Sequence, residues 1–213
     1  MLNTNPESFF KQETDAVNTE RNPLGTIPIQ LFTDQKEWRV WLKKNHAKST
    51  GLWLRLAKKG SGHNTVSYDE AIEEALCFGW IDGQKQKDDA SFWLQKFTPR
   101  TAKSIWSKIN RNKVAALIES ARMQAAGLHQ VELAKADGRW DAAYDGSSSA
   151  VVPDDFQIAL DANAKAQDFF VTLNRQNRYA ILFRIHNVRK AETRARKIRE
   201  FVAMLERHER VHG

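Results

Sequence analysis

One stretch of sequence determines the predicted fold class: Ser67-Tyr-Asp-Glu-Ala-Ile-Glu-Glu-Ala-Leu-Cys-Phe-Gly-Trp-Ile-Asp-Gly83. The spacing of its apolar residues changes part-way along. Ser67 and Glu70 have the spacing of a capping box, which starts a helix. Apolar residues then recur three and four positions apart, which predicts one buried helical face. From Trp80 the helical period stops and strand-like residues follow. The stretch therefore predicts an α+β fold, with a helix beside a sheet.

Further strands are predicted on both sides of this stretch. Ile29–Phe32 and Leu52–Leu56 have strand-like composition, and Phe92–Phe97 follows the strand that begins at Trp80. The polar stretch Gln84–Asp89 lies between the last two and predicts the connection of a hairpin. These strands form a small antiparallel sheet in the predicted fold.

Helices are predicted between and after the strands. Asp34 can cap a helix that ends near Asn45, and a helical hairpin is expected from beyond Arg100 to about Ala143. Beyond residue 150 the apolar spacing is helical throughout. Four helices are expected there, starting at Pro153, after Asp161 or Asn163, after Asn174, and at Ala191.

The composition changes near residue 145. All seven tryptophans precede residue 141, whereas residues 174–213 contain eleven Lys and Arg against four Asp and Glu and carry the whole net charge of +7. Asp145–Ala150 is small and polar, as a connection between domains should be. We predict a flexible tail at 1–26, an α+β domain at 27–144, a linker at 145–152 and an all-α helical domain at 153–213.

Composition also excludes several classes of protein. With 41% hydrophobic and 28% charged residues, the chain fits neither a disordered nor a fibrous class. It has no apolar run long enough to cross a membrane, and its N-terminus lacks the pattern of an export signal. Cys77 is the single cysteine, so no intramolecular disulfide can form. We therefore expect a cytoplasmic protein without a transmembrane segment.

The candidate ligand site is the densest cluster of aromatic and polar residues, between Cys77 and Asn110. Arg100 follows Thr-Pro and could bind a carboxylate or phosphate with two parallel hydrogen bonds. The alternative is structural: the aromatic residues form core, Arg100 pairs with Asp82, and the serines cap a helix. The predicted ligand-binding residues are Trp80, Asp82, Trp93, Phe97, Arg100, Ser104, Trp106, Ser107 and Asn110.

Familiar enzyme signatures are absent from the sequence. There is no Gly-x-Ser-x-Gly, P-loop or Rossmann glycine pattern, and no histidine spacing that suits a metal site. Cys77 would lie near Glu70 and Glu73, which would raise the pKa of its thiol rather than activate it. We predict no catalytic residue, metal or cofactor. Chemistry without a known motif would start from Glu70, Glu73, Glu74 and Asp82.

A basic run near the C-terminus gives an alternative binding surface. Arg189, Lys190, Arg194, Arg196, Lys197 and Arg199 could neutralise phosphates of a nucleic acid or an anionic surface. Glutamates at helical spacing, such as Glu192 and Glu200, could pair with the same basic residues. A solvated helix face is the competing interpretation.

Several of these segments resemble the bacterial YdeI/OmpD-associated, or bacteriocin-protection, family. They are Ser67–Gly83, Lys96–Arg100, Ser104–Ser107 with Asn110, Gly138–Trp140, Phe169–Leu173 and Lys190–Arg194. The resemblance covers roughly Ile29 to Leu205. It implies a YjbR-like or frataxin-like first domain, a helical C-terminal portion and a role in protection against bacteriocins or cationic peptides. It implies no established reaction.

The predicted function combines these observations. We expect non-enzymatic binding of a small anionic ligand or a partner peptide in stress or antimicrobial-peptide resistance. Nucleic-acid or anionic-surface binding through the basic run is one alternative. An enzyme of unrecognised chemistry is the other.

Overall fold

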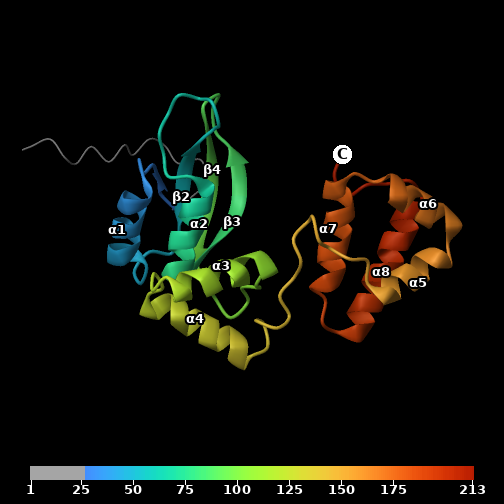
Figure 1. The fold of residues 1–213 in the computed structure, drawn as a ribbon. Coiled ribbons are helices and arrows are strands. Elements are labelled where there is room, and N and C mark those ends of the chain that lie inside the picture. Colours follow the sequence, from blue (N-terminus) through green and yellow to red (C-terminus); the bar gives the residue numbers. More distant parts are fainter. Residues whose placement is uncertain (1–26) are drawn as a thin grey trace, which may run out of the picture.

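The computed structural model describes residues 27–213, so the predicted tail at 1–26 lies outside the described residues. Four strands and several helices form the first part, and helices alone form the second (Figure 1). The α+β fold class is therefore confirmed. Among residues 27–213, no helix combines the length and apolar character needed to cross a membrane.

The sheet contains four strands in the order β1-β2-β4-β3. They are β1 (Ile29–Gln30), β2 (Leu52–Ala57), β3 (Trp80–Lys87) and β4 (Phe92–Pro99). The prediction of an antiparallel sheet was wrong at one edge, where β1 runs parallel to β2. Helix α1 (Gln35–Asn45) connects these two strands, and such a crossover places both in the same direction.

Two strand boundaries differ from the prediction. β1 ends at Gln30 rather than Phe32, because Phe32 turns toward the tryptophans of α1. β3 continues through the predicted connection as far as Lys87, since Lys85 and Lys87 pair with β4 across the sheet. The turn between the strands lies at residues 88–91 instead. The sequence pattern failed there because this exposed edge strand carries polar side chains.

Helix α2 (Tyr68–Cys77) begins at the predicted capping box. The Ser67 hydroxyl accepts a hydrogen bond from the Glu70 N–H, and the Glu70 carboxylate accepts one from the Ser67 N–H at 2.9 Å. Helices α1 and α2 lie side by side against the sheet. The indole N–H of Trp38 donates to the Ala71 carbonyl at 3.1 Å and joins the two helices.

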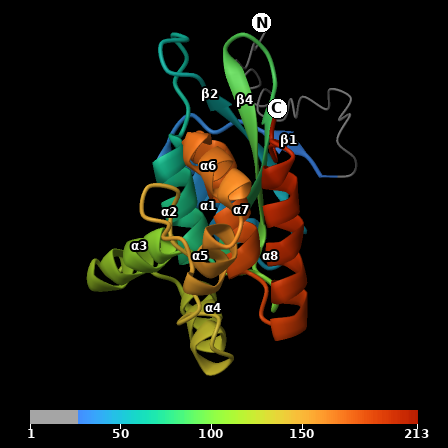
Figure 2. The ribbon, with the colours of Figure 1, turned by 90° about the vertical axis from the view of Figure 1, so that its right-hand side faces the viewer.

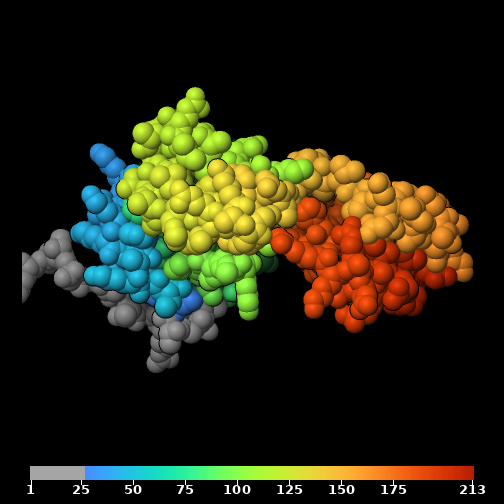
Figure 3. All heavy atoms as spheres, turned by 90° about the horizontal axis from the view of Figure 1, so that it is seen from below, coloured from blue at the N-terminus to red at the C-terminus, as the bar shows by residue number. Residues whose placement is uncertain are grey.

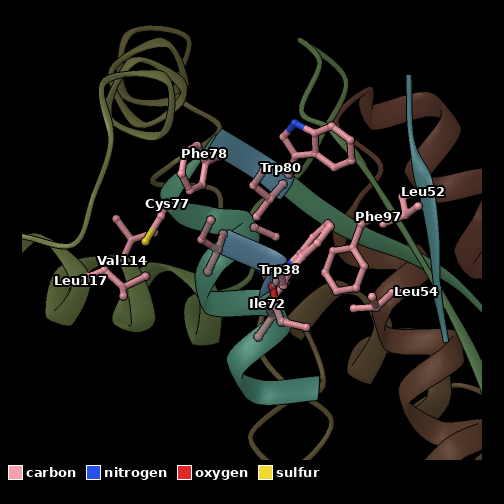
Figure 4. Close-up of a cluster of buried hydrophobic side chains, with 14 of the residues drawn as sticks. Trp38, Leu52, Leu54, Ile72, Cys77, Phe78, Trp80, Phe97, Val114 and Leu117 are labelled. Atoms are coloured by element: carbon pink, nitrogen blue, oxygen red, sulfur yellow. The ribbon is translucent and has the colours of Figure 1, made fainter. Parts of the chain in front are cut away.

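The first hydrophobic core lies between the sheet and these helices (Figure 4). Leu52 and Leu54 of β2 and Phe97 of β4 point from the sheet toward Trp38 and Ile72 of the helices, and all five are at most 2% exposed. Alternation of large apolar side chains along β2 places the leucines on one face.

Two further helices close the lower end of this core. They are α3 (Lys108–Glu119) and α4 (Ala125–Ala136), which form the predicted helical hairpin. Helix α4 approaches the end of α2 closely at Gly127, where an added Cβ would lie 2.3 Å from the Cys77 carbonyl oxygen. A side chain would not fit at this crossing, so the glycine is required by packing.

The second part consists of four helices around a separate core (Figure 2). Phe156, Phe170, Ile181, Ile185 and Phe201 belong to this core, which shares no residue with the first. The predicted caps Asn163 and Asn174 both accept the expected backbone hydrogen bonds. The helices are α5 (Asp154–Asp161), α6 (Ala164–Thr172), α7 (Arg175–His186) and α8 (Ala191–Glu206).

The connection at 145–152 runs alongside α7 and joins the two parts (Figures 1 and 3). Tyr144 packs its ring edge-on against Phe183 with centroids 4.9 Å apart. The Tyr179 hydroxyl donates to the Asp145 carbonyl at 3.1 Å, and Lys108 forms an ion pair with the Asp145 carboxylate. These contacts link the start of the connection to both parts.

Candidate functional site

Arg100 lies immediately beyond β4, where the chain leaves the sheet. Its backbone N–H donates to the Gly79 carbonyl at 2.9 Å, which ties this turn to the end of α2. The guanidinium stacks over the indole of Trp106, 3.5 Å from the ring centroid. The side chain is only 5% exposed. Neighbouring backbone and an aromatic face therefore fix the position of a buried cation.

The hydrogen bonds of Arg100 are incomplete. Its Nη1 donates to the Ile105 carbonyl at 3.3 Å, whereas Nε and Nη2 are buried and make no hydrogen bond within the described residues. No carboxylate of residues 27–213 forms an ion pair with it. Asp82 acts on it only at longer range, so the ion pair of the structural alternative is not present. Burial lowers the pKa of Arg100 to about 9, because a desolvated cation is disfavoured.

Arg139 provides a comparison within the same region. It is 8% exposed, nearly as buried as Arg100. Its Nε donates to the Asp137 carboxylate at 2.7 Å and its Nη1 to the Ser104 carbonyl at 2.9 Å. A buried arginine in this fold can therefore find partners, as buried polar groups usually do. Arg100, in contrast, keeps two buried donors without a partner, and this difference needs an explanation.

Oxygen-bearing side chains near Arg100 interact with one another and with its charge. The Tyr68 hydroxyl donates to the Asp82 carboxylate at 2.8 Å, and burial together with Asp82 raises the pKa of Tyr68 well above its usual range. Burial and Asp82 also raise the pKa of Tyr144, while a hydrogen bond with Ser107 and the charge of Arg100 act in the opposite direction. Several perturbed groups in one place are typical of functional sites.

The predicted site residues divide into two groups. Asp82, Arg100, Trp106 and Ser107 lie together in this cluster. Tyr68 and Tyr144 were missed, although Tyr68 lies within the capping-box stretch quoted above. No local signal marks Tyr144. It reaches Trp106 through a backbone hydrogen bond of 3.0 Å between residues 38 positions apart in the chain.

The side chains of the other predicted residues make contacts elsewhere. Trp80 and Phe97 are in the hydrophobic core and are at most 1% exposed, so we leave them out of the proposed site (Figure 4). Trp93 stacks beneath the Lys85 ammonium and near Tyr68. The remaining two belong to local turns: the Ser104 hydroxyl accepts from the Thr101 N–H, and the Asn110 N–H donates to Ser107.

The predicted basic surface on α8 is partly paired. Arg194 donates two hydrogen bonds to the Asp155 carboxylate and one to the Ile185 carbonyl, so it joins α8 to α5 and α7. Arg196 and Lys197 both form ion pairs with Glu200. The predicted residues Arg189, Lys190 and Arg199 are exposed on the same helix or just before it.

The acidic side chains of α2 form a structural network. Glu74 is 2% exposed, and its carboxylate forms ion pairs with Arg39 and Arg122 and accepts a hydrogen bond from Gln35. Cys77 is fully buried one turn further along, and burial raises the pKa of its thiol. Glu74 is therefore fully engaged as an ion-pair partner. Within residues 27–213 no group of three acidic, histidine or cysteine side chains could hold a metal ion.

Comparison with known families assigns the two parts separately. Residues 30–130 match a domain of unknown function (DUF8412). Residues 149–208 match the family described as bacteriocin-protection, YdeI or OmpD-associated. The C-terminal segment carries this family's domain. The family resemblance is confirmed there, whereas the resembling segments before residue 130 match the other model instead.

No curated protein and no solved structure shows a significant match to the chain. The YjbR-like or frataxin-like character of the first part therefore stays a prediction.

Proposed function

We propose that this protein binds a small anion through Arg100. The observation that carries the proposal is the pair of buried donors, Nε and Nη2, that have no partner among the described residues. An unsatisfied buried donor costs about 1–3 kcal/mol, and more when it is charged. A bound carboxylate or phosphate would satisfy both donors and neutralise the charge.

The two free donors are the pair that suits a carboxylate. Nε–H and Nη2–H lie on the same side of the guanidinium and can bind both oxygens of one acid group. Arg194 uses this same pair on the Asp155 carboxylate, at 2.5 and 2.9 Å. Arg207 does the same with Glu209. In Arg100 the pair is free, so the ligand's acid group would take the place that an Asp or Glu occupies at these other arginines.

The neighbouring residues would set which anions fit. Trp106 covers one face of the guanidinium and would exclude water from it. Tyr144 and Ser107 bear hydroxyl groups that can donate to a ligand oxygen. The Asp82 carboxylate repels a second negative charge, so an anion with one acid group is favoured over a multiply charged one. Tyr144 is half-buried and lies beside the connection to the second part, which is the proposed side of entry.

The cellular role remains the one implied by the family. We propose that anion binding in the first domain, residues 27–144, serves stress or antimicrobial-peptide resistance and that the protein acts in the cytoplasm without catalysing a reaction. The match of residues 149–208 supports the resistance role.

Thermal unfolding in the presence of simple anions tests the proposal. Formate, acetate and phosphate are compared with chloride at equal ionic strength, since a ligand of the folded state raises the midpoint temperature. We expect formate or acetate to raise it in the wild type, more than phosphate does, and to have no such effect in Arg100→Met. Arg111→Met is the matched control, because Arg111 also lies over a tryptophan but has a backbone partner. Equal shifts in wild type and Arg100→Met would refute the proposal.

A further inference from the structure

A cavity lies in the helical part, and Arg100 is not among the residues that line it. It has a volume of about 640 Å³, within the range of small-molecule sites. Helix α7 supplies most of its lining, and the connection and the C-terminus close two sides. The lining includes Ser147, Arg175, Gln176, Tyr179, Phe183 and His212.

The wall of this α7 cavity is apolar. Helix α7 buries Ile181 and Ile185 in the second core, yet it also carries Tyr179 and Phe183 on the side that faces the connection. Both aromatic side chains are only partly buried. Ala180 adds a further apolar contact between them. The helix thus has apolar residues on two faces, and only one of them is covered by the core.

The charges around the cavity have one sign. Arg175 and Arg184 lie on α7, and His212 lies opposite them on the C-terminal segment. No Asp or Glu lines it. The basic residues are therefore not neutralised within the lining, and they favour an anion.

The cavity continues past Tyr179 into a neighbouring depression of about 260 Å³. The two share Ser147, Arg175 and Tyr179, and the second also lacks an acidic residue. It adds Arg178, whose buried Nε makes no hydrogen bond within the described residues. A second arginine donor without a partner thus lies next to the apolar wall.

The C-terminal side of the cavity is held in place by a buried amide. Asn177 is 3% exposed, accepts a hydrogen bond from the His212 N–H at 2.8 Å and donates one to the His212 carbonyl at 3.2 Å. This pair of bonds fixes the last residues of the chain against α7. The cavity is therefore bounded by a secured segment rather than by a free end.

We infer that the α7 cavity binds an amphipathic anion, a molecule with an apolar body and a single acid group such as a fatty acid. Tyr179 and Phe183 would contact the apolar body, and Arg175 and Arg178 near the start of α7 would bind the acid group. Arg184, toward the other end of the helix, would add to the positive potential of the cavity. The site is separate from Arg100, because no residue of the Arg100 cluster lines either depression.

Three probes separate the contributions of tail and charge. Binding to the full chain is measured by titration calorimetry, with decanoate below its micelle concentration as the ligand. Decyltrimethylammonium is the control with the same apolar tail and the opposite charge. Butanoate is the control with the same charge and a short tail. We expect binding of decanoate at least tenfold tighter than that of either control. Comparable binding of decyltrimethylammonium or of butanoate would overturn the inference.

Substitutions locate the site. Gln176→Glu adds a negative charge to the lining and should weaken decanoate binding about tenfold. The fold should survive, because an acidic residue in the first turn favours a helix. Arg175→Gln with Arg184→Gln should have the same effect, whereas Arg199→Gln on α8 should have none.

Arg100→Met should leave decanoate binding unchanged, which distinguishes failure of this inference from failure of the Arg100 proposal. Decanoate binding that Gln176→Glu does not weaken would place the ligand elsewhere and contradict the inference.

Discussion

At the scale of single residues, Arg100 and Arg139 make a matched pair. Both are buried, but only Arg100 has buried donors without a partner. Because a buried unpaired charge destabilises a fold, Arg100→Met should raise the free energy of unfolding by about 1 kcal/mol in the absence of ligand. Arg139→Met should lower it by about 2 kcal/mol, since it leaves backbone and carboxylate acceptors without a donor. Urea titrations measure the free energy of unfolding of both variants. A clear decrease in that of Arg100→Met would indicate that Arg100 has a structural role.

The charge of Arg100 also predicts a dependence on pH. Its folded-state pKa of about 9 is below the value of the unfolded chain, so the unfolded state binds more protons once the pH exceeds about 9. The free energy of unfolding of the wild type should therefore rise relative to Arg100→Met between pH 8 and 10.5. The difference between the two proteins is the quantity to follow, because the lysines and the tyrosines other than Tyr144 titrate equally in both. Both proteins therefore carry Tyr144→Phe, since the Arg100 charge acts on the pKa of Tyr144. A difference that stays constant would contradict the assigned pKa.

At the scale of elements, Glu74 joins α1, α2 and the segment before α4 through Arg39 and Arg122. Glu74→Gln would leave these two cations without their buried partner and should lower the free energy of unfolding by about 2 kcal/mol. The arginines are about one-third exposed, which limits the loss. Glu73→Gln is the control, with an expected loss below about 1 kcal/mol because its ion pairs are more exposed. Equal losses would show that burial of Glu74 does not matter.

Most elements were predictable because their signals are local. The capping box at Ser67, the asparagine caps of α6 and α7 and the alternating leucines of β2 all lie within a few residues of the structure they specify. The direction of β1 was not predicted, because it depends on the crossover between β1 and β2. The length of β3 was not predicted either, because it depends on pairing with β4.

The candidate site was predictable only in part for the same reason. Arg100, Trp106 and Ser107 are close in sequence and could be grouped from it. Whether Arg100 has a partner depends on which carboxylates the fold brings near it, and no sequence spacing encodes that. The contact of Tyr144 with Trp106 joins residues far apart in the chain, so it has no local signal either.

At the scale of the whole molecule, the two hydrophobic cores share no residue and a short connection joins them. We predict that they unfold at different urea concentrations. All seven tryptophans belong to the first part, so tryptophan fluorescence reports on it alone, whereas circular dichroism at 222 nm reports on the helices of both. The two probes should give different midpoints. Coincident curves would mean that the contacts of Tyr144 and Asp145 with α7 make one cooperative unit.

The central claim is that the free donors of Arg100 receive an anion, and NMR of the arginine side chains tests it most directly. The Nε–H signal of each arginine is followed in ¹H–¹⁵N spectra during titration with acetate, and Arg100→Lys identifies the signal of interest. The account predicts a saturable downfield shift of the Arg100 Nε–H, with the signal of Arg139 unchanged. An Arg100 signal that does not move, or that moves in proportion with the signals of exposed arginines, would contradict it.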